Sequence, residues 1–404
     1  MAVFCNLGVY LVLISLAVVS ELSTGGLHNN PGQGGAPPGQ GGVPPGHGGI
    51  PPGQLHSRNY RNKKSQVVDA IRQQRKHWEA DVNTDFEALG LEDFKELLGA
   101  QPSNSSARPE KNPPPGRRGP KKQGQNDDDG QEQGQGQGRG QGQGRGRGNE
   151  RRKRQTLPAT YDVRTWFPMC KSIDSVRYQY KCSSCWAVTA ASLISDRHCL
   201  YNHLKTGQLY FSPYQIISCV PRGCDGGKEW DAYDYWIRYG LVSGGTAYAN
   251  ANQPTGCLPY PAGLNTTPTT CPTTCSASYE KSFQEDRVYG GADYLWWFPS
   301  VDRIKQEIYS YGPVAAFFRV YEDFFYYKSG VYERTYGNLV GYHLTKLIGW
   351  GTENGVDYWL AVNTWGTNWG QNGLFKIRRG NDSAGVGIED RITFVLPKEP
   401  IMAG

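Results

Sequence analysis

The stretch Gln179-Tyr-Lys-Cys-Ser-Ser-Cys-Trp186 decides how the rest of this chain can be interpreted. It runs directly into a segment at 187–198 in which apolar residues recur at helical spacing. We therefore expect Cys185 in the first turn of a buried helix. A helix N-terminus carries partial positive charge that favours a thiolate, so this position predicts a lowered pKa for the Cys185 thiol. A neighbouring imidazole would complete its activation.

The stretch resembles the nucleophile segment of the papain family of cysteine proteases. The family pattern is Cys-Gly-Ser/Ala-Cys-Trp/Tyr, with the second cysteine as nucleophile. Here Ser183 stands in place of the glycine. Because Cys182 and Cys185 also fit a redox-active dithiol or half of a zinc site, more distant residues must decide.

Those distant residues occur in the order that the resemblance requires. Gly341-Tyr-His-Leu344 is similar to the family's histidine strand, and Asn363-Thr-Trp-Gly366 to its asparagine segment. The separation of Cys185 from His343 is 343 − 185 = 158 residues, longer than the ~130–150 of papain and cathepsins. An insertion is implied, and this is where the cathepsin B-like branch is enlarged.

The resemblance covers residues 157–396 and implies an α+β, papain-like fold. A helical left lobe and a β-barrel-like right lobe would hold the active site between them. From Tyr289 onward the sequence is rich in aromatic and β-branched residues. It predicts one helix at 301–311, ended by Gly312-Pro313, and strands around Phe317, Tyr326, Val331, 346–350 and 358–362.

By resemblance, Cys185 is the nucleophile, His343 its acid–base partner, and Asn363 the residue that orients the imidazole. Gln179 and the Cys185 backbone N–H would stabilise the oxyanion. A lone histidine on a strand is more often structural, and an asparagine can serve only a turn. Four matches in the expected order favour the catalytic interpretation.

Three further residues are expected to bind substrate. Gly226 and Gly227 match the family's segment that pairs with the substrate backbone, where glycine allows close approach. Trp365 matches the aromatic residue beside the S1′ site. The alternatives are a plain turn for the glycines and core packing for the tryptophan.

The cleft departs from the family at four positions. Ser183 and Tyr342 replace glycines that border S1, and Leu344 replaces a small residue near S2. Arg391 falls where cathepsin B has an acidic residue at the floor of S2, which predicts poor tolerance of basic P2 residues and a preference for acidic ones. The alternative for Arg391 is an exposed strand residue.

The insertion between Cys257 and Cys275 is shorter than the occluding loop of cathepsin B and contains no histidine. Because those histidines hold the substrate carboxylate in cathepsin B, we expect an endopeptidase rather than a dipeptidyl carboxypeptidase. Asn104, Asn265 and Asn381 lie in N-glycosylation sequons.

Eight of the ten cysteines remain once Cys5 and Cys185 are set aside. An even number in a secreted chain indicates disulfides. The resemblance to cathepsin B implies the pairs Cys170–Cys199, Cys182–Cys224, Cys219–Cys271 and Cys257–Cys275. A partner elsewhere for Cys182 weakens the redox and zinc interpretations.

The N-terminal part is expected to be a removable precursor segment. Residues 1–20 are typical of a signal peptide, and 21–64 hold Gly/Pro-rich heptapeptide repeats that predict a disordered spacer. Residues 65–100 resemble the short inhibitory propeptide of cathepsin B, with a helix from Val67 to Trp78 and a cleft-crossing segment from Lys95 to Ala100. Residues 65–100 are too few to bury a core of their own, so we expect them to pack on another part of the protein.

Residues 101–154 are a low-complexity linker that ends in Arg151-Arg-Lys-Arg154. This sequence fits a furin-type convertase site, and cleavage would leave 155–404 as the protease domain. Residues 1–154 hold 21 basic and 15 acidic residues, and the remainder 22 of each, so 21 − 15 gives the whole net charge of +6. The charge therefore does not indicate a nucleic-acid-binding domain.

The chain is thus expected to be a monomeric cysteine endopeptidase of the secretory pathway, extracellular or lysosomal. Its partners would be protein or peptide substrates, a convertase, its own propeptide and cystatin-like inhibitors, with no membrane span, metal or cofactor. The alternative is a catalytically weak cathepsin B-like protein that binds peptides or matrix, because Ser183 and Tyr342 would crowd S1.

Overall fold

The computed structural model describes residues 64–74, 77–82, 89–104, 106–114, 156–245, 256–380, 382 and 384–398. The predicted signal peptide, heptapeptide repeats, Arg151–Arg154 site and Asn381 sequon lie outside these residues. No helix in the described part of the chain is long and apolar enough to cross a membrane.

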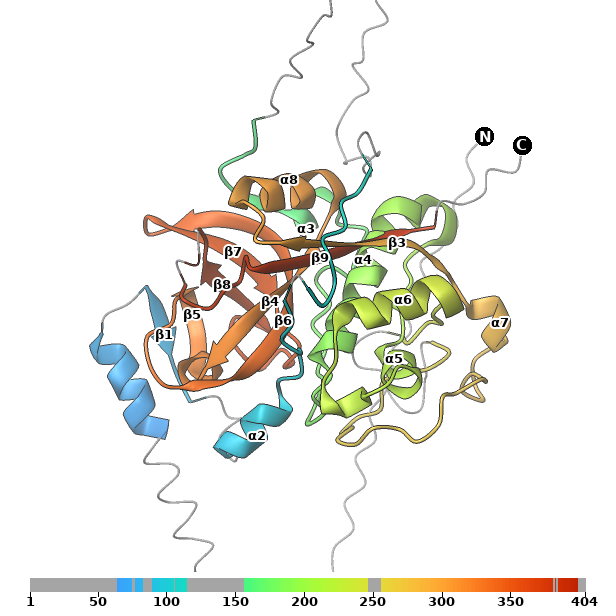
Figure 1. Cartoon of the computed structure of the whole chain (residues 1–404), viewed down its shortest axis with the longest axis horizontal. Helices are drawn as coiled ribbons and strands as arrows, with labels where there is room; N and C mark the ends of the chain where they lie inside the picture. Colours follow the sequence, from blue (N-terminus) through green and yellow to red (C-terminus); the bar gives the residue numbers. More distant parts are fainter. Residues whose placement is uncertain are drawn as a thin grey trace, which may run out of the picture. The chain divides into compact units, whose positions relative to one another are not determined.

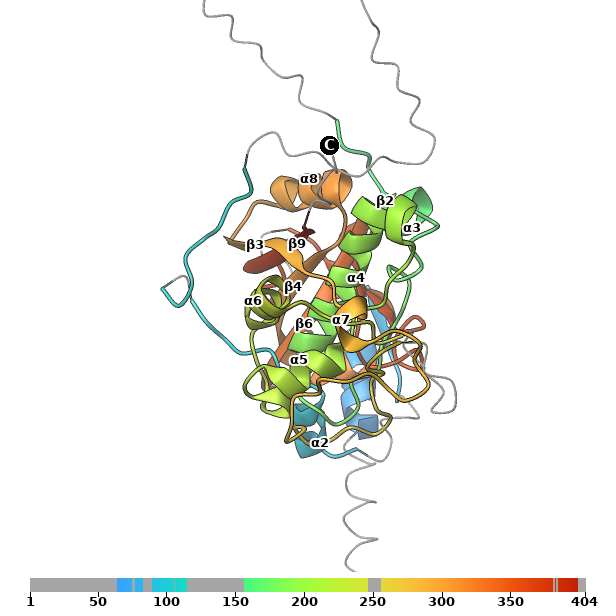
Figure 2. The ribbon, with the colours of Figure 1, turned by 90° about the vertical axis from the view of Figure 1, so that its right-hand side faces the viewer.

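Helices dominate the first half of the region that begins at residue 156. Helix α4 (Cys185–Thr206) contacts α5 (Pro213–Cys219), α6 (Glu229–Tyr239) and strands of the sheet (Figure 2). Because neighbours surround α4, every residue from 184 to 200 is buried. The described residues of this part also include three short helices: α3 (Val163–Trp166), η2 (Gly223–Asp225) and α7 (Phe283–Asp286).

The second half supplies seven strands, β3 to β9, of a sheet that has nine strands within the described residues; β1 and β2 come from earlier in the chain (Figure 1). Its order is β1-β5-β8-β7-β6-β4-β9-β3, with β2 paired to β6, and β5–β8 is its parallel pair. The strands are β1 (Trp78–Ala80), β2 (Tyr161–Asp162), β3 (Gly290–Trp297), β4 (Val314–Tyr321), β5 (Tyr327–Tyr332), β6 (Leu339–Glu353), β7 (Val356–Val362), β8 (Leu374–Arg378) and β9 (Arg391–Pro397). The predicted α+β class is confirmed.

Local signals placed one helix correctly. Helix α8 (Val301–Tyr311) starts after Ser300, whose hydroxyl accepts the Arg303 N–H, and ends at Gly312, which has a φ of 104°. Tyr326, expected in a strand, instead ends the 3₁₀ helix η3 (Glu322–Tyr326) immediately before β5.

All four predicted disulfides are present: Cys170–Cys199, Cys182–Cys224, Cys219–Cys271 and Cys257–Cys275. Among the cysteines that the structure describes, Cys185 is the free one. The redox and zinc interpretations of Cys182 and Cys185 are therefore wrong.

The N-terminal residues pack on the sheet side. Residues 64–73 are helical, and α2 (Leu91–Glu96) follows β1. Phe94 of α2 stacks on Phe325 with the ring centroids 4.1 Å apart. The helix expected to reach Trp78 ends sooner, because Trp78 pairs with Gly330 at the edge of β5. Tertiary pairing here overrides helical spacing.

Buried polar contacts join α4 to β6. Lys346 Nζ lies 2.7 Å from Asp196 Oδ2, and both side chains are almost fully buried. The Thr189 hydroxyl donates to the Leu344 carbonyl at 3.1 Å. These contacts fix the helix that carries Cys185 against the strand that carries His343.

Candidate active site

Cys185 is the first residue of α4 and is fully buried. Backbone N–H groups of Leu344, Trp186 and Ala100 donate toward its sulfur and favour the thiolate. Burial outweighs them and raises the pKa of the Cys185 thiol to about 12. The expected lowering is therefore wrong, because burial disfavours the thiolate more than the surrounding N–H groups favour it.

His343 lies on β6, and Asn363 follows β7, the next strand of the sheet. The His343 Nε2 is 2.8 Å from Asn363 Oδ1, which also accepts the Thr364 N–H. Because an amide oxygen only accepts, Nε2 must carry the proton. His343 Nδ1 has no hydrogen-bond partner among the described residues, so it can accept a proton.

The imidazole is also in an apolar setting. Its ring centroid lies 4.9 Å from that of Trp365, and burial lowers the pKa of His343 to about 4. With the Cys185 pKa near 12 and the His343 pKa near 4, both groups are neutral at pH 7. The occupied site thus holds no thiolate–imidazolium pair.

Gln179 is fixed at both ends of its amide. Its Nε2 donates to the Cys182 carbonyl at 2.9 Å, and the Thr364 hydroxyl donates to its Oε1 at 2.6 Å. An amide nitrogen has two N–H groups, so one remains to donate to a developing oxyanion. Thr364, which the sequence reasoning missed, holds both Gln179 and Asn363.

Residues 97–101 of the N-terminal segment cross this site. The Gly227 N–H donates to the Gly99 carbonyl at 2.8 Å, and the Gln101 N–H donates to the Gly227 carbonyl at 2.9 Å. From the opposite side, the Tyr342 carbonyl accepts the N–H groups of Gly99 and Ala100. The segment is therefore bound through its backbone on both sides.

Glycine is required at two points of this contact. A Cβ on Gly99 would lie 2.0 Å from the Ser183 carbonyl oxygen. Gly226 has a φ of 78°, and a Cβ there would lie 2.9 Å from the Gly99 carbonyl oxygen. Ser183 is half-buried, and its backbone carbonyl lies against Gly99.

The aromatic residues leave room for a peptide. The Tyr342 ring stacks on Phe317, with 5.4 Å between the ring centroids, while its backbone pairs with the segment. Trp365 Nε1 donates to the Leu97 carbonyl at 2.9 Å. Leu344 is buried in the core between α4 and β6.

Arg391 is buried on β9, so the alternative of an exposed strand residue is wrong. Its guanidinium lies 3.0 Å from the Glu229 carboxylate and 3.9 Å from the Phe317 ring centroid. It also donates to the Gln101 carbonyl at 3.1 Å. The sequence reasoning missed Glu229, although this acidic residue two positions after Gly227 was a visible signal for a partner.

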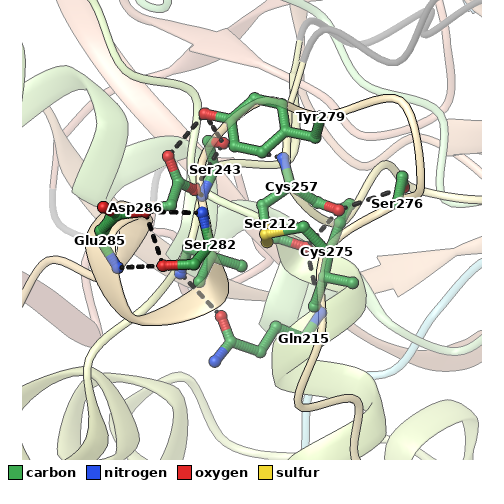
Figure 3. Close-up of a disulfide and its surroundings, with 12 residues drawn as sticks. Ser212, Gln215, Ser243, Cys257, Cys275, Ser276, Tyr279, Ser282, Glu285 and Asp286 are labelled. Carbon is green, nitrogen blue, oxygen red and sulfur yellow. Dashed lines mark hydrogen bonds between the residues drawn. A yellow bond between two sulfur atoms is a disulfide. The ribbon is translucent and has the colours of Figure 1, made fainter.

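The loop between Cys257 and Cys275 is fixed at its base (Figure 3). The Ser243 hydroxyl donates to Asp286 Oδ2 at 2.7 Å and accepts the Cys257 N–H. Tyr279 donates to the other oxygen of Asp286. Asn265, in the loop itself, is exposed.

The sequence of this fold and site is similar to that of known proteins. Residues 157–396 match the family model described as papain family cysteine protease. The chain is 45% identical over 241 residues to cathepsin B-like cysteine proteinase 3 of Caenorhabditis elegans, covering 56% of this chain and 63% of that protein. It is 42% identical over 244 residues to the gut-specific cysteine proteinase of the same organism, covering 57% and 71%.

A solved structure extends the similarity to a precursor form. Procathepsin B S9 from Trypanosoma congolense superposes with a TM-score of 0.63 at 30% sequence identity. The match covers 82% of this chain and 98% of that one. The helical side and the sheet side described above correspond to the two lobes of that fold.

Proposed function

The chain belongs to the papain family of cysteine proteases, in its cathepsin B-like branch, and we propose that it is a zymogen that hydrolyses peptide bonds through Cys185, His343 and Asn363. One observation carries the proposal. The chain's own residues 97–101 lie backbone-paired across a free cysteine that starts a buried helix. A cleft that binds an extended peptide there would also bind a substrate.

In the proposed reaction, His343 Nδ1 takes the thiol proton once the site is open, and the Cys185 sulfur attacks the substrate carbonyl carbon. The oxyanion accepts hydrogen bonds from the Cys185 backbone N–H and the remaining Gln179 N–H. The imidazolium then protonates the leaving amine as the C–N bond breaks. Water hydrolyses the thioester, with His343 as base and Asn363 holding the ring.

Residues 65–100 act in this proposal as the inhibitory propeptide, and the protease domain begins at Gln155 after cleavage at Arg154. Residues 1–20 direct the chain into the secretory pathway, toward the lysosome or the outside of the cell. Backbone pairing of residues 99–101 with Gly227 and Tyr342 supports latency, because the bound segment occupies the place where a substrate would lie.

The first test compares labelling of Cys185 before and after processing. In the uncut chain we expect a biotinylated epoxysuccinyl inhibitor to react at Cys185 far more slowly than after convertase cleavage and removal of the segment. Mass spectrometry of the adduct, with Cys185→Ala as control, measures this. No adduct on folded, processed protein would favour the peptide-binding alternative.

A peptide series tests the mode of cleavage and the P2 preference. Because residues 257–275 contain no histidine to hold a substrate carboxylate, we expect internal cleavage and no release of C-terminal dipeptides. Arg391 disfavours a basic P2 residue, although Glu229 offsets part of its charge. We expect P2-Phe and P2-Glu peptides to be cleaved faster than P2-Arg. Dipeptide products, or fastest cleavage of P2-Arg, would overturn these assignments.

A further inference from the structure

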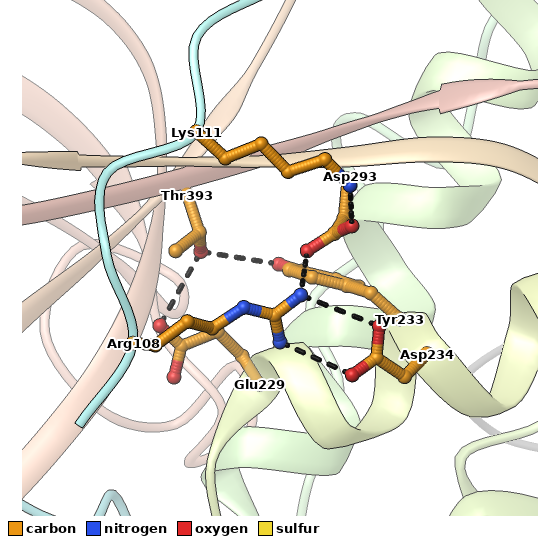
Figure 4. Close-up of polar contacts among 7 residues, drawn as sticks. All are labelled: Arg108, Lys111, Glu229, Tyr233, Asp234, Asp293 and Thr393. Carbon is orange, nitrogen blue, oxygen red and sulfur yellow. Dashed lines mark hydrogen bonds and ion pairs between the residues drawn. The ribbon is translucent and has the colours of Figure 1, made fainter.

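The N-terminal segment makes a second set of contacts beyond the cleft. Residues 106–114, inside the region expected to be a low-complexity linker, lie along α6 and β3 (Figure 4). These residues are separate from residues 97–101, which cross the catalytic site.

Two carboxylates on the protease part bind the basic residues of this stretch. Arg108 contacts Asp293 at 2.5 Å and Asp234 at 3.2 Å. Lys111 Nζ contacts the other oxygen of Asp293 at 2.7 Å. Both oxygens of the Asp293 carboxylate are therefore held by cations of the N-terminal segment.

The backbone takes part as well. Lys111 and Leu295 exchange both of their N–H···O bonds, so the segment adds to the open edge of β3. The indole of Trp297 donates to the Arg108 carbonyl at 3.0 Å. This pairing fixes the register that brings the two cations, three residues apart, onto the carboxylates.

The carboxylate of Asp293 is buried where the segment contacts it. With residues 106–114 bound, its side chain is only 2% exposed, and every hydrogen bond or ion pair of its carboxylate within the described residues is with Arg108 or Lys111. A carboxylate with so little water requires cationic partners. The protease part thus offers a site whose chemistry calls for a guanidinium and an ammonium on an extended chain.

We propose that Asp234, Asp293, Trp297 and the Leu295 edge of β3 form a peptide-binding site, distinct from the active-site cleft, for extended basic segments of the pattern Arg-x-x-Lys. Its resident ligand is the chain's own stretch 108–111. The site retains the N-terminal segment after the chain is cut, so cleavage of the linker alone does not open the active site. That regulatory consequence rests on the proposed zymogen function.

Retention can be measured without catalysis, in the full chain carrying Cys185→Ala and a site-specific protease sequence in place of Arg151–Arg154. After cutting, we expect Arg108→Gln/Lys111→Gln to speed dissociation of the N-terminal fragment roughly tenfold or more. Asp293→Asn, on the protease part, should speed dissociation of the fragment to a similar extent. Lys95→Gln, whose side chain pairs with Glu92 inside α2, is the matched control and should dissociate at the original rate.

A second measurement presents the ligand separately. A fluorescent peptide of residues 106–113 should bind the uncut Arg108→Gln/Lys111→Gln chain, and the same peptide with glutamine at both basic positions should not. Adding Asp293→Asn should abolish binding. Equal dissociation rates, or equal binding of the two peptides, would overturn the site. Because Cys185 is replaced throughout, absence of protease activity would leave these results unaffected.

Discussion

Replacing Gly99 by alanine is expected to release the active site in the uncut chain. The new Cβ would lie 2.0 Å from the Ser183 carbonyl oxygen and 2.3 Å from its carbon, both backbone atoms that cannot rotate away. The segment must shift and lose its pairing with Gly227 and Tyr342. Overpacking of this kind costs roughly 3 kcal/mol, on the order of 100-fold weaker occupation of the site.

The measurement is the rate at which iodoacetamide alkylates Cys185 in the uncut chain at pH 7. It should rise in Gly99→Ala, because opening the site removes the burial that keeps the thiol pKa near 12. Gly90→Ala is the matched control: the same change in the same segment, where the new Cβ meets only Asp93 Oδ2 at 3.4 Å. Equal rates for the two variants would show that residue 99 does not control access.

Replacing Lys346 by methionine is expected to destabilise the folded chain by roughly 3–5 kcal/mol, because it leaves the buried carboxyl of Asp196 without the cation it faces. Lys346 is 2% exposed in its side chain and Asp196 fully buried, and Lys346 also donates to the Ser192 hydroxyl at 2.9 Å. Arg177 stays close enough to Asp196 to offset some of the loss.

Urea unfolding in the Cys185→Ala background measures the free energy of unfolding without self-digestion. The double variant Lys346→Met/Asp196→Leu should recover part of the loss, since the Asp196 carboxyl is no longer buried without Lys346, while buried Arg177 loses its interaction with Asp196. Lys95→Met, which breaks an exposed pair with Glu92, should cost less than about 1 kcal/mol. A loss of less than about 1 kcal/mol for Lys346→Met would mean that the Lys346–Asp196 pair does not hold α4 against β6.

Local sequence determined much of this fold. The apolar spacing after Cys185 placed the start of α4, and Ser300 with Gly312-Pro313 bounded α8, because helix ends depend on residues within one turn. The order of Cys185, His343 and Asn363 identified the family and, through it, the four disulfide pairs.

Other features depend on segments that are far apart in the chain. Trp78 lies in β1 and not in the helix expected from its spacing, because its backbone pairs with Gly330 at the edge of β5. Glu229 meets Arg391 across 162 residues, and Arg108 meets Asp293 across 185. The sequence does not say which charges meet, because the two residues of each pair are brought together only by the fold.

The protonation of the catalytic residues was likewise decided by the tertiary structure. Sequence position alone predicted a reactive thiolate at Cys185 from the helix N-terminus. The folded chain buries the thiol, and the pKa rises to about 12 instead. The sequence by itself determined which residues and family chemistry are present; only the tertiary structure decided that the pKa of Cys185 is raised and that of His343 lowered, because desolvation is a property of the whole surrounding structure.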